Sequence, residues 1–334
     1  MQIIRNKPVL FLLSTLCLMY GLKEPVLSQT CCSGGVPLSG NIGFAGAGPG
    51  TLQMEMSYDL NYLSLLKRGS ERIFEDSRIR LTQSVLYKTG YSIGDNLAVD
   101  ALFSYVFQSR RIQFQESTSI AETNGLGDAL LMVKLVLPGV FGKPIDLQIG
   151  AGPKVPLGKS NLTDDRGITY NADMQPGSGS WDFLSWAYGS WKPKFRPAGL
   201  ITARIVARLN GVNNEYLGSG SYQFGHSTQA YLGYLDQFLL GKVLISPSMQ
   251  VKYRHVREDR ISGVELLNTG GQWLYLVPGL SWHIRPKLTL NLAPEIPIYS
   301  RVNGIQLSPT FRFQAGIYVL IDMKKEKNSN LFQL

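Results

Sequence analysis

Hydrophobic and polar residues alternate strictly along residues 96–108. One face carries Leu97, Val99, Ala101, Phe103, Tyr105 and Phe107, and the other carries Asn96, Asp100, Ser104 and Gln108. A period of two sustained over this length predicts a β-strand with one apolar face and one partly wetted face.

Similar alternation recurs along most of the chain, with turn signals between the repeats. We expect strands at Thr51–Leu63, Arg78–Lys88, Asn96–Gln108, Ala129–Leu137, Ile145–Ala151, Trp181–Trp191, Ala198–Leu209, Tyr222–Tyr234, Val243–Val256, Gln272–Ile284, Lys287–Ala293 and Thr310–Ile321. After residue 28, no stretch has the roughly eighteen consecutive apolar residues of a membrane helix. The sequence therefore predicts an all-β fold, an antiparallel transmembrane β-barrel of about twelve strands of the outer-membrane type.

The side chains of two strands show which face should meet lipid. Ala198–Leu209 and Val243–Val256 each carry charged residues at alternate positions. An Arg or Lys facing lipid at the midplane costs about 2–4 kcal/mol, so the charged face should line the lumen. The residues expected to line the lumen and contribute to selectivity are Arg204, Arg208, Gln250, Lys252 and Arg254. Tryptophans near strand ends are expected to form an interfacial girdle, namely Trp181, Trp186, Trp191, Trp273 and Trp282.

The N-terminus has the pattern of a secretory signal peptide. Arg5 and Lys7 precede an apolar run at residues 9–20 that is too short to cross a bilayer, which disfavours the alternative of a membrane anchor. We expect a signal peptide at 1–28, a glycine-rich segment at 29–50 that can act as a plug, the barrel at 51–322 and a polar tail at 323–334. Export through a cleaved signal peptide implies a location in the bacterial outer membrane.

Charge and composition limit the kinds of partner that we expect the protein to bind. The formal net charge is +9, but the compact basic and aromatic clusters of nucleic-acid-binding proteins are missing. We expect no nucleic-acid partner and a monomer that contacts the lipid bilayer, its lipopolysaccharide and a small-molecule solute. Long polar segments at Gln108–Gly127, Gly158–Ser180 and Arg257–Gly271 are typical of extracellular loops, and the short break at Pro138–Pro144 is typical of a periplasmic turn.

Motifs for catalysis are lacking. His226, His255 and His283 fall on different expected strands, and the sequence has no HExxH, GxSxG or CxxC pattern. His226 and Ser227 are adjacent, but neighbouring residues on a strand point to opposite faces and cannot work as a pair. We expect no enzymatic activity and no cofactor.

Cys31 and Cys32 are the only cysteines after the expected cleavage site. In an oxidising compartment they can form a vicinal disulfide, pair with another protein or bind a soft metal. A lipid anchor is disfavoured because Ser28-Gln29-Thr30 lacks the small residue required before a lipidated cysteine.

Glycine-rich motifs in the middle third of the chain carry a family resemblance. They are Gly125-Leu126-Gly127-Asp128, Lys154-Val155-Pro156-Leu157-Gly158 and Gln175-Pro176-Gly177-Ser178-Gly179-Ser180-Trp181-Asp182. In these motifs the chain resembles the phenol-degradation MetA-pathway family of outer-membrane proteins, which is distantly related in fold to the long-chain fatty-acid transporters. The resemblance implies a transporter-like barrel, with structural roles for Gly125, Gly127, Asp128, Gly177, Gly179 and Asp182.

The sequence thus predicts an outer-membrane barrel that passes small, hydrophobic molecules. The alternative is a barrel that does not transport but anchors an envelope complex or a surface partner, which fits the same periodicity.

Overall fold

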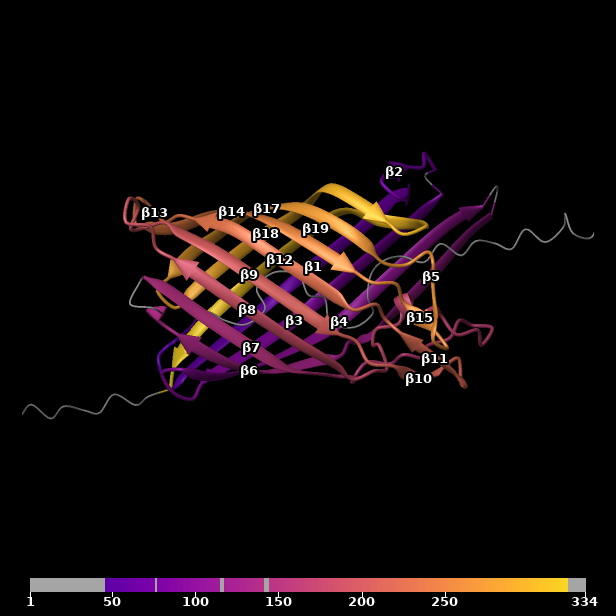
Figure 1. Ribbon diagram of the computed structural model, residues 1–334, viewed down its shortest axis with the longest axis horizontal. Helices are drawn as coiled ribbons and strands as arrows, with labels where there is room; N and C mark the ends of the chain where they lie inside the picture. The colour runs from indigo at the N-terminus through magenta and orange to yellow at the C-terminus, as the bar shows by residue number, and fades with distance from the viewer. Residues whose placement is uncertain (1–45, 76, 115–116, 141–143, 324–334) are drawn as a thin grey trace, which may run out of the picture.

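A computed structural model describes residues 46–75, 77–114, 117–140 and 144–323. Cys31 and Cys32, the expected signal peptide, most of the glycine-rich segment and nearly all of the polar tail lie outside these residues. Within them, twelve long antiparallel strands close into a barrel, as the alternation predicts (Figure 1). The strands are β1 (Thr51–Arg68), β3 (Arg78–Ser92), β4 (Leu97–Phe114), β6 (Ala129–Leu137), β7 (Ile145–Val155), β8 (Asp182–Trp191), β9 (Leu200–Leu209), β12 (Ser227–Leu235), β14 (Val243–Val256), β17 (Gly271–Arg285), β18 (Leu288–Val302) and β19 (Ile305–Asp322).

The barrel closes between its first and last strands. β1 pairs with β19 from Thr51 opposite Asp322 to Arg68 opposite Ile305, and each other barrel strand pairs with its neighbours along the chain. Mostly short turns connect the strands at one end, and the longer connections lie at the other, together with the tight turn between β18 and β19. We call these the short-turn end and the long-loop end.

Several strands, such as β1, β3 and β7, extend four or five residues beyond the predicted ends, and three differences are larger. The expected loop at Gln108–Gly127 is mostly strand, because β4 continues to Phe114 and β5 (Ser117–Leu126) pairs with it. Both faces of this hairpin carry polar residues, so it lacks the alternation that marks a strand with one apolar face. Farther along, β18 and β19 extend to a tight turn at Asn303-Gly304, and Tyr222 belongs to β11 (Gly220–Gln223) rather than to the barrel strand that follows.

Small strands extend the barrel at both ends. β2 (Glu71–Arg72) pairs with β1, and β13 (Phe238–Leu240) pairs with β14. The connections after β9 and β14 together form a separate four-stranded sheet at the long-loop end, made of β10 (Asn213–Tyr216), β11, β15 (Arg260–Ile261) and β16 (Val264–Glu265). Among the described residues, no helix is long and apolar enough to span a membrane.

The two faces of the barrel wall differ in chemistry. Apolar side chains such as Ile205, Leu232 and Val251 are exposed on the outside. Polar and charged side chains from the alternate positions are buried inside, which is the arrangement of an outer-membrane barrel. Trp181, Trp191 and Trp282 are exposed on the outer surface, but the prediction was wrong for Trp186 and Trp273. Both face the lumen and are 3% and 0% exposed, because they occupy inward positions of their strands, on the same face of the sheet as the charged residues.

Neighbouring residues on β9 test this sidedness. Ile205→Arg should reduce the folded fraction in lipid vesicles, because a charge facing lipid near the midplane costs about 2–4 kcal/mol. Arg204→Glu should leave assembly largely intact and alter ion preference. Heat-modifiable gel mobility measures the folded fraction, with Ile205→Leu as the conservative control. Better assembly of Ile205→Arg than of Arg204→Glu would contradict the register.

Candidate functional site

The wall formed by β8, β9, β12, β14 and β17 brings together the charged residues predicted for the lumen. Arg204, Arg208, Lys252 and Arg254 are at most 9% exposed and lie on its inner face, and Gln250 is half-buried on the same face. Their role in selectivity stays a prediction.

Aromatic rings alternate with these cations. Arg204 lies opposite Tyr231 in the strand register, and its guanidinium is 4.1 Å from the Tyr231 ring centroid. The Lys252 ammonium is 5.4 Å from the same ring and 5.2 Å from that of Tyr275, while Arg254 lies 5.4 Å from Trp273. Cation–π contacts of this kind stabilise a cation that is removed from water.

Lys252 and several other lumen cations form ion pairs with carboxylates. The Lys252 ammonium lies 2.8 Å from the Glu295 carboxylate, and both side chains are buried. Three further pairs of this kind link neighbouring strands at 2.9–3.2 Å, namely Lys88–Glu55, Lys134–Asp100 and Arg312–Asp59. Breaking a buried pair leaves an uncompensated charge, so these contacts fix the strands around the lumen.

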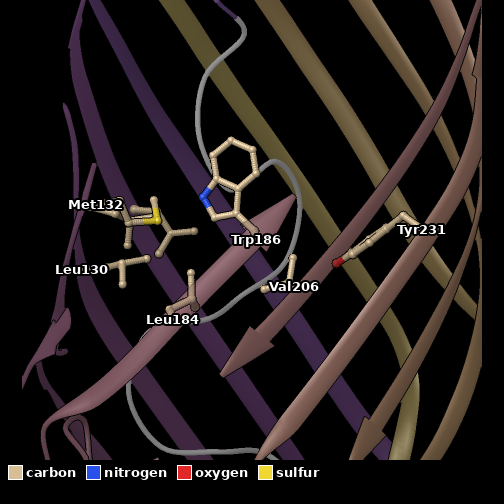
Figure 2. Close-up of a cluster of buried hydrophobic side chains, with 8 residues drawn as sticks. Leu130, Met132, Leu184, Trp186, Val206 and Tyr231 are labelled. Atoms are coloured by element: carbon tan, nitrogen blue, oxygen red, sulfur yellow. The ribbon is translucent and has the colours of Figure 1, made fainter. Parts of the chain in front are cut away.

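One side of the lumen is apolar. Leu130, Met132, Leu184, Trp186 and Val206 project inward from β6, β8 and β9 and are all buried (Figure 2). The cluster also includes Leu86, Leu102 and Tyr231. An inner wall with this many apolar side chains differs from the polar wall of a water-filled porin.

Two cavities lie inside the short-turn half of the barrel. Their volumes are about 120 and 90 Å³. Arg204, Tyr231 and Gln250 line both cavities, and Glu295 lines the larger one. A small organic molecule in this region would meet cationic, aromatic and amide groups together.

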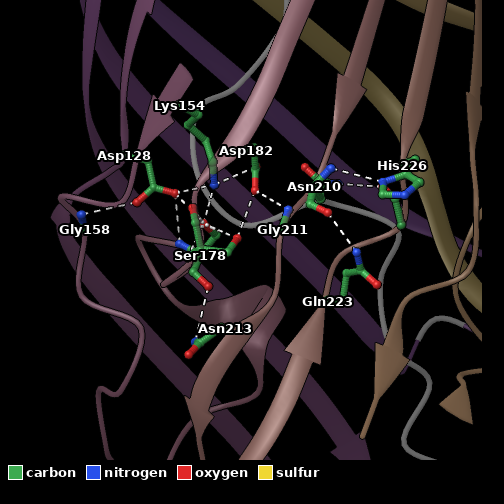
Figure 3. Close-up of polar contacts among 12 residues, drawn as sticks. Asp128, Lys154, Gly158, Ser178, Asp182, Asn210, Gly211, Asn213, Gln223 and His226 are labelled. Carbon is green, nitrogen blue, oxygen red and sulfur yellow. Dashed lines mark hydrogen bonds and ion pairs between the residues drawn. The ribbon is translucent and has the colours of Figure 1, made fainter. Parts of the chain in front are cut away.

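A buried ionic cluster ties the strands together at the long-loop end. The Lys154 ammonium lies 2.7 Å from the Asp128 carboxylate and 2.8 Å from that of Asp182, and it contacts the Ser178 hydroxyl (Figure 3). Asp128 also accepts hydrogen bonds from the backbone N–H groups of Gly158 and Ser178, at 3.2 and 3.0 Å. The cluster therefore joins β6, β7 and β8 to the long connection between β7 and β8.

That long connection folds inward across the barrel mouth. Its 3-10 turn η2 (Ala172–Met174) is buried, and Asp173 forms an ion pair with Arg80 of β3 at 2.9 Å. Gln108 of β4 accepts a hydrogen bond from Arg80 at 2.6 Å and donates one to the Gln175 carbonyl at 3.1 Å. A loop that starts on β7 is thus anchored on β3 and β4.

Close approaches explain several glycines of the three glycine-rich motifs. A Cβ on Gly177 would lie 2.3 Å from the Gly158 carbonyl oxygen, so a larger residue would push these two segments apart. Gly179 has φ +68°, and a Cβ there would lie 2.3 Å from the Asn213 side chain. The left-handed backbone at Gly179 favours glycine for a second reason. Gly125 and Gly127 lie at the junction of β5 and β6, and a Cβ on Gly127 would lie 2.2 Å from the Ser104 hydroxyl.

The four-stranded sheet packs over the inward loop. Ala172 of η2 contacts an aromatic cluster of Tyr216, Tyr222 and Phe224. The Tyr222 hydroxyl donates a hydrogen bond to the buried Asp259 carboxylate at 2.6 Å. Burial raises the pKa of Asp259 to about 6. Loops from three parts of the chain therefore close the long-loop end together.

His226 lies just before β12 and lines a cavity at the long-loop end together with His255 of β14, whereas His283 lies on β17. His226 accepts a hydrogen bond from the Asn210 backbone N–H at 3.0 Å (Figure 3). His283 lies near the short-turn end, where its ring nitrogens are 2.9 Å from the Ser246 hydroxyl and 3.1 Å from that of Thr289. Neither Ser246 nor His283 lines the two cavities described above. No group of three or more potential ligands able to hold a metal ion occurs within the described residues.

Sequence reasoning missed the ionic cluster at Lys154 and the anchor at Arg80 and Asp173. Lys154 falls at an inward position of β7, and Arg80 falls at an inward position of β3. The alternation of inward and outward positions could therefore have identified both as lumen residues. The position of Asp173 in a polar loop gave none.

Comparison with known proteins identifies the fold. No family model matches the sequence. An outer membrane channel from Pseudomonas putida F1 is similar with a TM-score of 0.67 and 14% identity, over 85% of this chain and 100% of that one. The beta domain of the Bordetella autotransporter Brka has a TM-score of 0.45 and 11% identity, over 80% of this chain and 99% of that one.

A Pseudomonas aeruginosa FadL homologue has a TM-score of 0.39 and 9% identity, over 82% of this chain and 90% of that one. The similarity to the Pseudomonas putida channel confirms the fold of a bacterial outer-membrane barrel. The resemblance to the phenol-degradation MetA-pathway family stays a prediction.

Proposed function

We propose that this protein is a channel of the bacterial outer membrane that passes small organic molecules with hydrophobic parts. The apolar cluster on the inner wall is the observation that carries this proposal. In a closed barrel of this size, inward apolar side chains beside cavities give a non-aqueous surface along which such molecules can move.

The arrangement of turns and loops gives the orientation. Outer-membrane barrels place short turns in the periplasm and longer loops outside the cell. The cluster around Lys154 and the inward loop would then close the extracellular mouth. Transport would require these contacts to open, and the cavities lined by Arg204 and Gln250 would lie on the periplasmic side of the closure.

Solute uptake tests the proposal. Vesicles with lipopolysaccharide in the outer leaflet and the full chain in the membrane should take up neutral aromatic alcohols faster than protein-free vesicles. Leu184→Asn should slow that uptake severalfold, because it places an amide in the apolar cluster. Leu267→Asn makes the same change on an exposed loop and should leave uptake unchanged.

The outcome also decides between the two functions predicted from the sequence. If vesicles with folded protein take up aromatic alcohols, fatty acids and small ions no faster than protein-free vesicles, the channel proposal fails. The barrel that anchors an envelope or surface partner would then be favoured.

A further inference from the structure

We propose that Arg208 anchors a binding site for small amphipathic anions inside the lumen, where its guanidinium binds a carboxylate attached to an aromatic or short aliphatic body. The proposal rests on the channel function above and names the class of solute.

Arg208 differs in its contacts from the lumen cations that form ion pairs. Its side chain lies on the inner face of β9 and is 2% exposed. No described residue forms a hydrogen bond or ion pair with it, and its Nε is buried without an acceptor. By contrast, each of the lumen cations Lys88, Lys134, Lys154, Lys252 and Arg312 has a carboxylate oxygen within 3.2 Å.

A buried guanidinium without an acceptor is costly, since it loses hydration and gains no hydrogen bond in return. Such a group calls for an acceptor from outside the described residues, and a ligand can supply it. Its five N–H donors have a planar geometry that matches a carboxylate, which can accept two parallel hydrogen bonds from it.

The carboxylates around Arg208 oppose the binding of an anion less than unpaired carboxylates would, because each has another partner. Asp182, Asp128 and Asp259 act on Arg208 electrostatically, and so does the cation Arg254. Asp128 and Asp182 are both in contact with Lys154, and Asp259 accepts hydrogen bonds from Tyr222 and the Gly225 N–H. These carboxylates therefore offset part of the positive charge of Arg208. They accept no hydrogen bond from it, so its N–H groups remain available to a ligand.

The residues beside Arg208 explain why the ligand should have an apolar body. In the strand register Leu184 lies opposite Arg208 on β8, and Ser227 lies opposite it on β12. Leu184 and Val206, two residues before Arg208, belong to the apolar cluster of the inner wall (Figure 2). A carboxylate on Arg208 would place its attached carbon skeleton next to these side chains. An inorganic anion would gain no such contact.

Equilibrium binding to the full chain, folded in detergent, tests the site. The probe is benzoate, measured by calorimetry, with benzamide as its neutral counterpart and inorganic phosphate as an anion without an apolar body. Benzoate should bind roughly tenfold or more tightly than either. Arg208→Gln should weaken benzoate binding by a similar factor, and Arg208→Lys should weaken it severalfold because a lysine cannot form the paired hydrogen bonds.

Arg312→Gln is the matched control, because it also removes one guanidinium from the lumen but one that is paired with Asp59. Its benzoate affinity should remain within about twofold of the parent. Equal losses for the two glutamine variants, or benzamide binding as tight as benzoate binding, would overturn the site. If Arg208→Gln does not fold, the site is tested by the comparison of the three probes and by the loss of benzoate affinity in Arg208→Lys.

Binding in detergent does not require transport, so the two proposals fail separately. Uptake of neutral alcohols without benzoate binding would refute the anion site and leave the channel. Arg208-dependent benzoate binding without uptake of any solute would refute the channel and leave the site.

Discussion

Replacement of Lys154 by methionine is expected to destabilise the barrel by about 3–5 kcal/mol, the range found when one partner of a buried ion pair is removed. The ammonium contacts two carboxylates, Asp128 and Asp182, which are both buried. Without it, two negative charges would face each other in a site that excludes water. Protonation of one carboxyl or separation of the strands would have to relieve the repulsion.

Unfolding by urea in lipid vesicles, followed by tryptophan fluorescence, measures the loss. Lys242→Met makes the same substitution at an exposed turn and should change the unfolding free energy by less than about 0.5 kcal/mol. A triple variant with Lys154→Met, Asp128→Asn and Asp182→Asn should recover much of the stability, because the amides keep hydrogen-bonding groups and remove the charges. A Lys154→Met protein as stable as the Lys242→Met control would show that the cluster contributes nothing.

The barrel itself was predictable because lipid imposes a strict requirement on alternate residues. Every second side chain of β4 from Leu97 to Phe107 is apolar, and that pattern alone gave the strand, its outward face and its inward face. Charged residues at alternate positions of β9 and β14 independently identified the lumen-facing side of those strands. The turn glycines and prolines then separated the strands well enough to count them.

The closure of the long-loop end could not be predicted in the same way. The loop after β7 is mostly polar, so its composition does not distinguish a solvated loop from one folded into the mouth. Asp173 is buried beside Arg80 and Arg110, which both lie far away in the sequence. Trp186 and Trp273 were misplaced for a related reason, since tryptophan suits both a membrane interface and an apolar lumen.

The structure therefore combines a predictable wall with an interior set by long-range pairing. Ion pairs such as Lys252–Glu295 join strands that are separated in sequence, and the apolar cluster draws on β3, β4, β6, β8, β9 and β12. If the lumen conducts, solutes must pass between these fixed groups, and the inward loop is the element whose contacts lie across the mouth.

Asp173→Asn is accordingly expected to open the long-loop end. The asparagine is nearly the same size as the aspartate, but it removes the negative charge that lies 2.9 Å from Arg80 and 3.8 Å from Arg110. Loss of one partner of a buried ion pair costs about 3–5 kcal/mol, and here the loop can avoid part of that cost by leaving the mouth. The single-channel conductance in planar bilayers should therefore rise, and the loop should become sensitive to protease.

Asp164→Asn is the control for this prediction. Asp164 lies in the same loop, but its ion pair is with Arg166, whose side chain is 82% exposed, so its loss should change neither conductance nor protease sensitivity. Arg80→Gln should raise conductance as well, and the double variant with Asp173→Asn should add little to either single change because both act on one contact. Equal conductance of Asp173→Asn and Asp164→Asn would show that the inward loop does not limit passage, since the contact anchoring it would then have been removed without effect.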